Sequence, residues 1–261
     1  WTPDIIHSHT ILPSCHLAVE YARIFDVPVI GTVHGWDFDV GLNVHRNTMK
    51  LLLSQLDGLI TVNETHIGIA EREGFNGEIG LIPCPPSIES DPDPEHVINI
   101  EERRVKILFP SSVKRPEKDY PLFKSVIAEL ENRGWSVETM SLGECTKKEV
   151  ENRMLASDLV LITSKRETGP LVAKEATLLR RRVASVDVGD LRAWLPPVAI
   201  SESRDVGEIS DVVEATIGEP LDSWFIPSEF KSEWTLERLQ QFYKQVFKFH
   251  SIKSTPTHHK Q

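Results

Sequence analysis

Cysteine is scarce in this sequence, and its scarcity argues against a fold held together by disulfides. The 261 residues contain three cysteines, Cys15, Cys84 and Cys145, and these lack the spacing of a metal site. An odd, sparse set is typical of thiols in a reducing compartment. The sequence also has no apolar run of about 18 residues, so it predicts no membrane-spanning helix. It shows no signal peptide and no internal repeat of fixed period.

Acidic residues outnumber basic residues in this sequence. The chain carries 29 Lys and Arg against 39 Asp and Glu, a net charge of −10. This balance argues against a nucleic-acid surface as the main partner. Hydrophobic residues make up 40% of the chain, which is enough for a real core. The length suits one large domain or two small ones.

Short apolar runs alternate with helical patterns along residues 1–82. The apolar runs predict strands at 4–9, 27–35, 58–63 and 78–82. Apolar residues at helical spacing predict helices between them, at 17–24, 48–56 and 65–73. Strands that alternate with helices of this length form parallel βαβ units. We therefore expect an α/β domain here.

Proline marks the end of this first block. Residues 83–104 mix prolines with Ser, Asp and Glu, which predicts a linker or a long surface loop. The alternation resumes over 105–230, with strands expected at 105–109, 137–140, 158–162, 183–186 and 198–200. The longer helices expected in this second domain are 120–132, 146–155 and 206–217. A terminal helix is predicted at 231–250 and a polar, disordered tail at 251–261.

Two glutamates lie in the segment that follows the predicted strand at 158–162. Glu167 comes just before a Gly-Pro pair, and Glu175 lies within the helix that begins there. A helix N-terminus offers free N–H groups to a phosphate, and Pro170 suits its first turn. Spacing alone favours a solvated face and a cap over a site. The position after a strand of an open α/β sheet favours a ligand.

Residues 164–175, with 183–190 after them, resemble the Glu-x7-Glu motif of retaining glycosyltransferases of family 4. The resemblance extends over nearly the whole chain, and is most specific between residues 105 and 190. It implies the GT-B fold, in which two Rossmann-like domains face each other and the C-terminal one holds most of the donor.

The resemblance also implies roles for the residues of this element. Glu167 would accept hydrogen bonds from hydroxyls of the donor sugar, and we name it as a catalytic residue. Glu175 would bind the two ribose hydroxyls. The backbone that meets the diphosphate or the sugar would be that of Gly169, Pro170, Leu171 and Val172.

A basic loop follows the first strand of the second domain. Lys114, Arg115 and Lys118 could neutralise a diphosphate there, although a solvated basic loop is an equally good interpretation of the sequence. Enzymes of family 4 place an Arg and a Lys of this loop on the donor pyrophosphate. Lys118 matches the family's Lys, whereas Lys114 and Arg115 both remain candidates for the Arg position.

His34 ends the second predicted strand, where the family often has a His near the reacting sugar. A His in this place can donate a hydrogen bond to a hydroxyl at neutral pH, so His34 is the second candidate catalytic residue. His7 and His9 end the first strand, and a site role for them is the weaker option. A metal site built from these histidines lacks supporting Cys or Asp spacing, and we expect no metal.

Two features depart from the family pattern. The family's first domain opens with a strand and a Gly-rich loop, whereas this chain begins with a strand that resembles the family's middle strands. We therefore expect the N-terminal domain to be incomplete, with a sheet edge or an apolar face uncovered. Arg180 and Arg182 also stand where the family has Gly and Pro, and Arg180 falls where a helix C-cap favours the left-handed conformation of Gly.

The function implied is that of a retaining, hexosyltransferase-like enzyme. It would move a sugar from a nucleotide-diphosphate sugar to a hydroxyl acceptor, with no metal or other cofactor, in the synthesis of glycans, glycolipids or polysaccharide. We expect a cytoplasmic protein, with peripheral contact to a membrane as an option. The aromatic residues of the terminal helix favour core packing over such contact. A truncated, non-catalytic GT-B-like binding or scaffold protein is the main alternative, and a GT-B nucleotide-sugar epimerase is the third.

Overall fold

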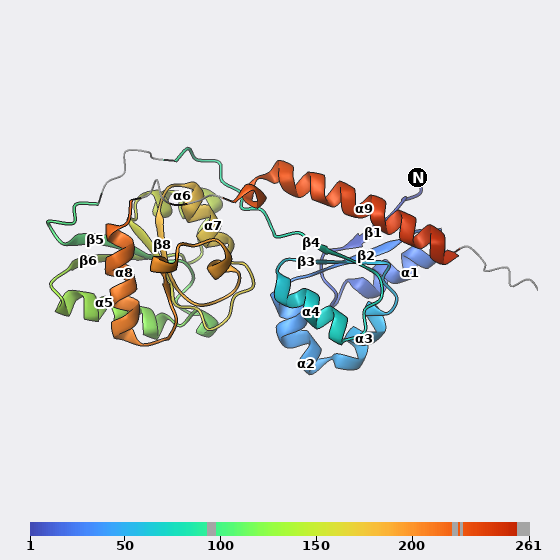
Figure 1. Ribbon diagram of the computed structural model, residues 1–261, viewed down its shortest axis with the longest axis horizontal. Coiled ribbons are helices and arrows are strands. Elements are labelled where there is room, and N and C mark those ends of the chain that lie inside the picture. The colour runs from blue at the N-terminus through green and yellow to red at the C-terminus, as the bar shows by residue number, and fades with distance from the viewer. Residues whose placement is uncertain (93–97, 221–223, 225–226, 255–261) are drawn as a thin grey trace, which may run out of the picture. The chain divides into compact units, whose positions relative to one another are not determined.

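The computed structural model describes residues 1–92, 98–220, 224 and 227–254. The chain forms two compact units. The first comprises Trp1–Cys84 with Lys231–Gln261, of which the part up to residue 254 is described, and the second comprises Pro85–Phe230. Each unit is a parallel sheet with helices packed against it, as Figure 1 shows, so the predicted pair of Rossmann-like α/β regions is confirmed.

The first unit is built on a four-stranded parallel sheet in the order β1-β2-β3-β4. Its strands are β1 (Ile6–Ser8), β2 (Val29–Val33), β3 (Gly58–Thr61) and β4 (Glu78–Leu81). The connecting helices are α1 (Cys15–Phe25), α2 (Leu42–Val44), α3 (Arg46–Leu53) and α4 (Glu64–Arg72). The strand-helix alternation predicted for this block is thereby confirmed, but the π-helical turn Asp37–Gly41 before α2 was not predicted.

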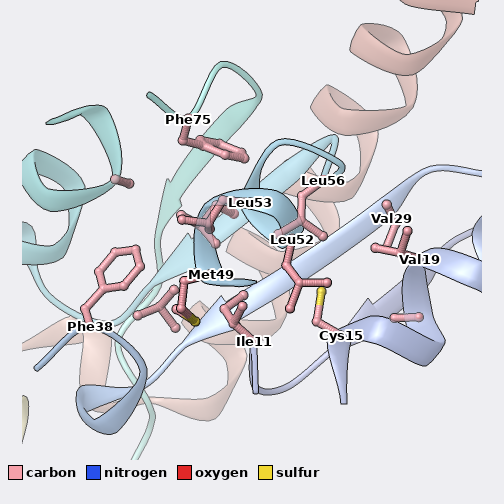
Figure 2. Close-up of a cluster of buried hydrophobic side chains, with 14 of the residues drawn as sticks. Ile11, Cys15, Val19, Val29, Phe38, Met49, Leu52, Leu53, Leu56 and Phe75 are labelled. Carbon is pink, nitrogen blue, oxygen red and sulfur yellow. The ribbon is translucent and has the colours of Figure 1, made fainter. Parts of the chain in front are cut away.

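The core of this unit lies between the sheet and the helices α1, α3 and α4. Figure 2 shows Cys15 beside Leu52 in this core, and Met49 belongs to the same cluster. All three side chains are buried, and Cys15 is therefore a small apolar core residue. Burial also raises the pKa of its thiol to about 12, which keeps it protonated.

The opposite face of the sheet is covered by the terminal helix, α9 (Ser232–Ser254). Phe242 and Val246 are buried there, and Figure 1 shows α9 running along the sheet. Two strand glycines permit the close approach. A Cβ at Gly58 would lie 2.6 Å from Val246 Cγ2, and one at Gly80 would lie 2.8 Å from Phe242 Cδ2. Core packing of the terminal helix is confirmed, and it covers this face of the sheet. The uncovered apolar surface of the unit lies instead on α1, where Leu17, Tyr21 and Ile24 are exposed.

The second unit holds a five-stranded parallel sheet in the order β6-β5-β7-β8-β9. Its strands are β5 (Arg104–Phe109), β6 (Ser136–Ser141), β7 (Leu159–Ile162), β8 (Arg182–Val186) and β9 (Ile200–Ser201). Its α-helices are α5 (Tyr120–Asn132), α6 (Lys147–Leu155), α7 (Leu171–Leu178) and α8 (Val206–Gly218). A capping box between Thr146 and Glu149 begins α6.

Alternation along β5 divides the core of this unit between the two faces of the sheet. Ile107 and Phe109 belong to a cluster with residues of α5 and α8. Leu108, between them, belongs to a second cluster with residues of α6 and α7. Helices therefore cover both faces, as a parallel sheet requires.

The described part of the proline-rich segment is anchored to α6. Glu151 is buried, and its carboxylate accepts hydrogen bonds from the N–H of Glu89 at 3.0 Å and from the hydroxyl of Ser90 at 2.5 Å. Lys147 adds an ion pair to Glu89 at 2.8 Å. Residues 85–92 thus belong to the second unit by their contacts as well as by their position in the chain.

Helix α7 ends in the turn where the sequence has Arg in place of Gly. Arg180 has φ 56°, in the left-handed region, and the N–H of Arg181 donates to the carbonyl of Ala176 at 2.8 Å. This is the backbone geometry expected at this position. The guanidinium of the next residue, Arg181, is buried and donates to the carbonyl of Leu155 at 2.8 Å.

The turn gives a stability prediction. A Cβ in the left-handed region costs about 1 kcal/mol, which glycine avoids. We expect Arg180→Gly to have a free energy of unfolding about 1 kcal/mol higher than that of Arg180→Ala, because both changes remove the same side chain and only alanine keeps the Cβ. Urea unfolding of the two variants measures the difference. Equal stability would show that the turn is not strained.

Candidate functional site

The candidate donor-binding residues of the second unit lie on the loops that follow β5 and β7. Lys118 on the first loop forms an ion pair with Glu167 on the second. Both side chains are largely buried, with 14% and 12% of their surface exposed. The hydroxyl of Ser164 donates to the same Glu167 oxygen at 2.6 Å. The structure thus brings together two of the residues predicted from the sequence.

Backbone contacts hold the two loops side by side. The N–H of Lys165 donates to the carbonyl of Glu117 at 2.8 Å. The hydroxyl of Thr163 donates to the carbonyl of Lys118, with the two oxygens 3.1 Å apart. Because these bonds involve main-chain atoms on at least one side, they fix the path of the loops independently of the Lys118–Glu167 pair.

The N-terminus of α7 begins directly after this loop. Pro170 is the N-cap residue, with φ −67° and ψ 106°, and the helix starts at Leu171. The sequence predicted Pro170 within the first turn of the helix, whereas in the structure it lies one residue before that turn. No side chain caps this end. The N–H of Ala173 donates to the carbonyl of Pro170 at 3.0 Å, and the N–H groups of Leu171 and Val172 before it are available to an anion.

A buried ion pair, not predicted from the sequence, supports this end of the helix. Lys174 is 2% exposed, and its ammonium lies 3.2 Å from Asp190 Oδ2 and over the ring of Phe230. A Cβ at Gly169 would lie 3.0 Å from the same Asp190 oxygen. Gly189 has φ 65°, which favours glycine. The loop after β8 thus packs tightly on the loop that carries Glu167.

Glu175 lies in a different environment from Glu167. It is half-buried on α7, and burial raises the pKa of its carboxyl, while a hydrogen bond from the backbone N–H of Ser87 opposes the shift. The buried Glu151 adds to the rise and Lys147 opposes it. This glutamate therefore faces the anchored segment at 87–90 and α6, whereas Glu167 faces Lys118.

The other two cations of the basic loop are solvent-exposed. The guanidinium of Arg115 contacts Glu117 Oε1 through Nε at 2.7 Å and through Nη2 at 2.6 Å. The carboxylate of Glu117 accepts hydrogen bonds from the backbone N–H of Glu117 and from the side chain of Arg115, and both bonds lower its pKa. Lys114 is exposed, and its backbone N–H donates a hydrogen bond to Ser112 Oγ. Neither cation reaches Glu167 as Lys118 does.

In the first unit, His34 lies after β2 in a partly buried position. Its Nδ1 is 3.9 Å from Cys84 Sγ, and burial lowers its pKa while the carboxylate of Asp37 only partly opposes the shift. The ring is therefore neutral at pH 7. Asp37 is buried and accepts the N–H groups of His34 at 3.0 Å and Ile11 at 3.1 Å. This carboxylate ties the start of the π-helical turn to the segment that follows β1.

His7 and His9 stack on one another with their ring centroids 4.5 Å apart. The nitrogens of His7 contact the hydroxyl of Tyr243 at 2.9 Å and that of Thr32 at 2.7 Å. His7 thus connects β1 and β2 to α9. Among the described residues, no group of three His, Cys, Asp or Glu side chains is arranged to hold a metal ion.

A family model described as Glycosyltransferase Family 4 matches residues 1–90. Over these residues, the resemblance to glycosyltransferase family 4 is confirmed. No curated protein sequence matches the chain at a significant level. None of the helices within the described ranges is both long enough and apolar enough to cross a membrane.

Solved structures of glycosyltransferases resemble the chain in fold. They include a TarM mutant from S. aureus in complex with fondaparinux, alpha-GlcNAc-glycerol and UDP, at 13% identity and a TM-score of 0.60, over 86% of this chain and 53% of that one. Sucrose-phosphate synthase from Thermosynechococcus elongatus is 15% identical, with a TM-score of 0.63 over 96% of this chain and 73% of its own.

The catalytic domain of starch synthase IV from Arabidopsis thaliana, bound to ADP and acarbose, is 13% identical, with a TM-score of 0.63 over 95% of this chain and 73% of its own. These likenesses establish the GT-B fold class. The chain spans about half of the length of the TarM chain.

The His7 contacts predict a loss of stability in acid. Burial, with smaller effects of His9 and His34, lowers the pKa of His7 from 6.5 to about 4. The neutral ring is therefore favoured by folding, and the stability it contributes is complete above pH 6.5 and falls as the pH drops from 6.5 to 4. Between pH 7 and pH 4 we expect the wild type to lose about 2 to 3 kcal/mol more than His7→Gln, which does not titrate.

The measurement is chemical unfolding at a series of pH values. The matched control is His16→Gln, because it makes the same change at a histidine that is exposed on α1. Parallel curves for the wild type and His7→Gln would contradict the assignment.

Proposed function

We propose that this chain acts as a retaining glycosyltransferase that moves a sugar from a nucleotide-diphosphate donor to a hydroxyl acceptor without a metal ion. The observation that carries the proposal is the Lys118–Glu167 ion pair beside the uncapped N-terminus of α7. A cation, a carboxylate and free N–H groups at one sheet edge can bind both the charged and the hydroxylated parts of such a donor.

The roles follow from the chemistry of each group. Lys118 is proposed to move from Glu167 to the diphosphate when the donor binds, which neutralises charge that grows as the glycosidic bond breaks. Glu167 is then free to accept hydrogen bonds from hydroxyls of the sugar. The N–H groups of Leu171 and Val172 add a second contact to the phosphates. Glu175 is proposed to bind the ribose hydroxyls in place of the N–H of Ser87.

Retention of configuration is proposed to follow front-face attack, in which the leaving diphosphate helps to deprotonate the acceptor hydroxyl. The protein then supplies position and charge stabilisation and no covalent nucleophile. His34 fits a hydrogen-bonding role toward a sugar hydroxyl, because burial keeps its ring neutral at pH 7. Between the two candidates for the second phosphate-binding cation, Lys114 is the less engaged, since Arg115 is paired with Glu117.

The acceptor is proposed to be a glycan or a lipid-linked glycan, used in the cytoplasm for the synthesis of polysaccharide or glycolipid. Of the three structures compared above, the TarM mutant is in complex with UDP and alpha-GlcNAc-glycerol, and the starch synthase domain is bound to ADP and acarbose. These ligands indicate which donors and acceptors to try first. A non-catalytic protein that only binds a donor is a possible outcome of the experiment below.

The proposal predicts that binding and transfer depend on different residues. In calorimetric titrations with UDP, GDP, ADP and CMP, we expect one nucleotide to bind. Lys118→Ala should weaken it by a factor of about 10 to 100, the value of a charge-assisted hydrogen bond, and Glu175→Gln by about tenfold. Glu167→Ala should keep nucleotide affinity, because this side chain meets the sugar, but should abolish transfer from the nucleotide sugar.

The matched control is Glu131→Gln, an exposed position near the C-terminal end of α5, at the opposite end of this helix from the Lys118 loop. Transfer by Glu167→Ala at the rate of the wild type would rule out the proposed mechanism. Binding by the wild type without transfer to any acceptor would favour a donor-binding protein over an enzyme.

A further inference from the structure

Arg204 lies in the loop between β9 and α8, and its guanidinium donates three hydrogen bonds to the two loops of the donor site. Nη1 donates to the carbonyl of Ser164 at 2.9 Å. Nη2 donates to the carbonyl of Thr163 at 2.7 Å and to Asp119 Oδ2 at 2.7 Å. One side chain thus contacts the backbone before Glu167 and the residue after Lys118.

The acceptors of Arg204 are themselves connected to the proposed donor-binding side chains. Ser164 donates its hydroxyl to Glu167, so a bond to its carbonyl fixes the residue that orients this carboxylate. Thr163 donates its hydroxyl to the carbonyls of Lys118 and Asp119, at 3.1 and 3.2 Å. The result is a closed set of bonds in which Arg204 joins the strand end of β7 to the loop of Lys118.

Asp119, which contacts Arg204, is unusual in two respects. It has φ 53°, in the left-handed region that costs a non-glycine residue about 1 kcal/mol. It is also the N-cap residue of α5, yet its side chain makes no capping bond. Its carboxylate instead meets Arg204, and Lys165 at 3.7 Å. Local strain of this kind persists where surrounding contacts determine the conformation, and is typical of functional sites.

Lysine could not replace this arginine. Three acceptors in different directions require the planar fork of a guanidinium, whereas an ammonium group is a point charge on a flexible stem. By contrast, Arg192 of the same unit is exposed, and among the described residues it pairs with the carboxylates of Asp187 and Glu202 alone. Arg192 is therefore a suitable control.

We infer that Arg204 is a positioning residue, which holds the loop of Lys118 and the loop of Glu167 side by side in the arrangement that a diphosphate sugar requires. The inference rests on the proposed function of these two side chains. Arg204 touches neither the donor nor the acceptor in this account. It acts through the carbonyls of Thr163 and Ser164 and through Asp119.

The first test needs no ligand. Acetic anhydride labels lysine amines, and the ion pair of Lys118 should protect it relative to the exposed Lys114 of the same loop. In Arg204→Gln we expect the labelling rate of Lys118, relative to that of Lys114, to rise about tenfold. Arg204→Lys should show most of this rise, and Arg192→Gln none. An unchanged ratio in a folded Arg204→Gln protein overturns the inference.

Asp119→Asn serves if Arg204→Gln does not fold, because it removes only the carboxylate that Arg204 contacts. The ratio should rise in this variant as well, and an unchanged ratio counts equally against the inference.

The second test measures function. The affinity of Arg204→Gln for the nucleoside diphosphate that the wild type binds should fall about tenfold, while its affinity for the corresponding nucleoside stays the same. A general loss of structure would weaken both. If the wild type binds no diphosphate, the proposed function fails and the labelling ratio alone decides whether Arg204 positions Lys118. If the wild type binds and Arg204→Gln binds equally well, only the inference about Arg204 fails.

Discussion

The parallel pairing of β5, β7 and β8 determines where the candidate residues of the second unit lie. Leu108 pairs with Val160, and Ile162 pairs with Ser185, so the three strands end at one edge of the sheet. The loops that carry Lys118, Glu167 and Asp190 all begin there, which explains why residues far apart in the sequence meet. A slip of one residue in either pairing would turn the strand side chains to the opposite face and displace these loops.

At this edge, opposite charges are held close together in a partly buried environment. The Lys118–Glu167 pair keeps both side chains ordered and compensates their charges, and the buried Lys174–Asp190 pair does the same beneath the start of α7. A buried charge is tolerated only with such a partner. In the proposed mechanism, a donor must exchange the first pair for contacts with its own phosphates and hydroxyls, whereas the second pair remains as support. This division separates a ligand-responsive cation from a structural one.

Much of this arrangement follows from local sequence, and some of it does not. The helical spacing of the apolar residues predicted both ends of α5 correctly. Arg180 occupies a position where Gly is usual, and this predicted its left-handed backbone conformation. Other features depend on contacts between distant parts of the chain. Asp119 and Arg204 are 85 residues apart, and Asp37 lies 26 residues from the backbone that it binds. Local periodicity carries no information about such pairs, and it did not identify Lys174 and Asp190 either.

The most direct test of the central claim is an experimental structure of the protein with the nucleoside diphosphate that it binds. The account predicts that the phosphates lie against the N-terminus of α7, with Lys118 Nζ within hydrogen-bond distance of a phosphate oxygen and released from Glu167. A diphosphate bound elsewhere on the chain, or one bound while Lys118 stays paired with Glu167, would contradict the account.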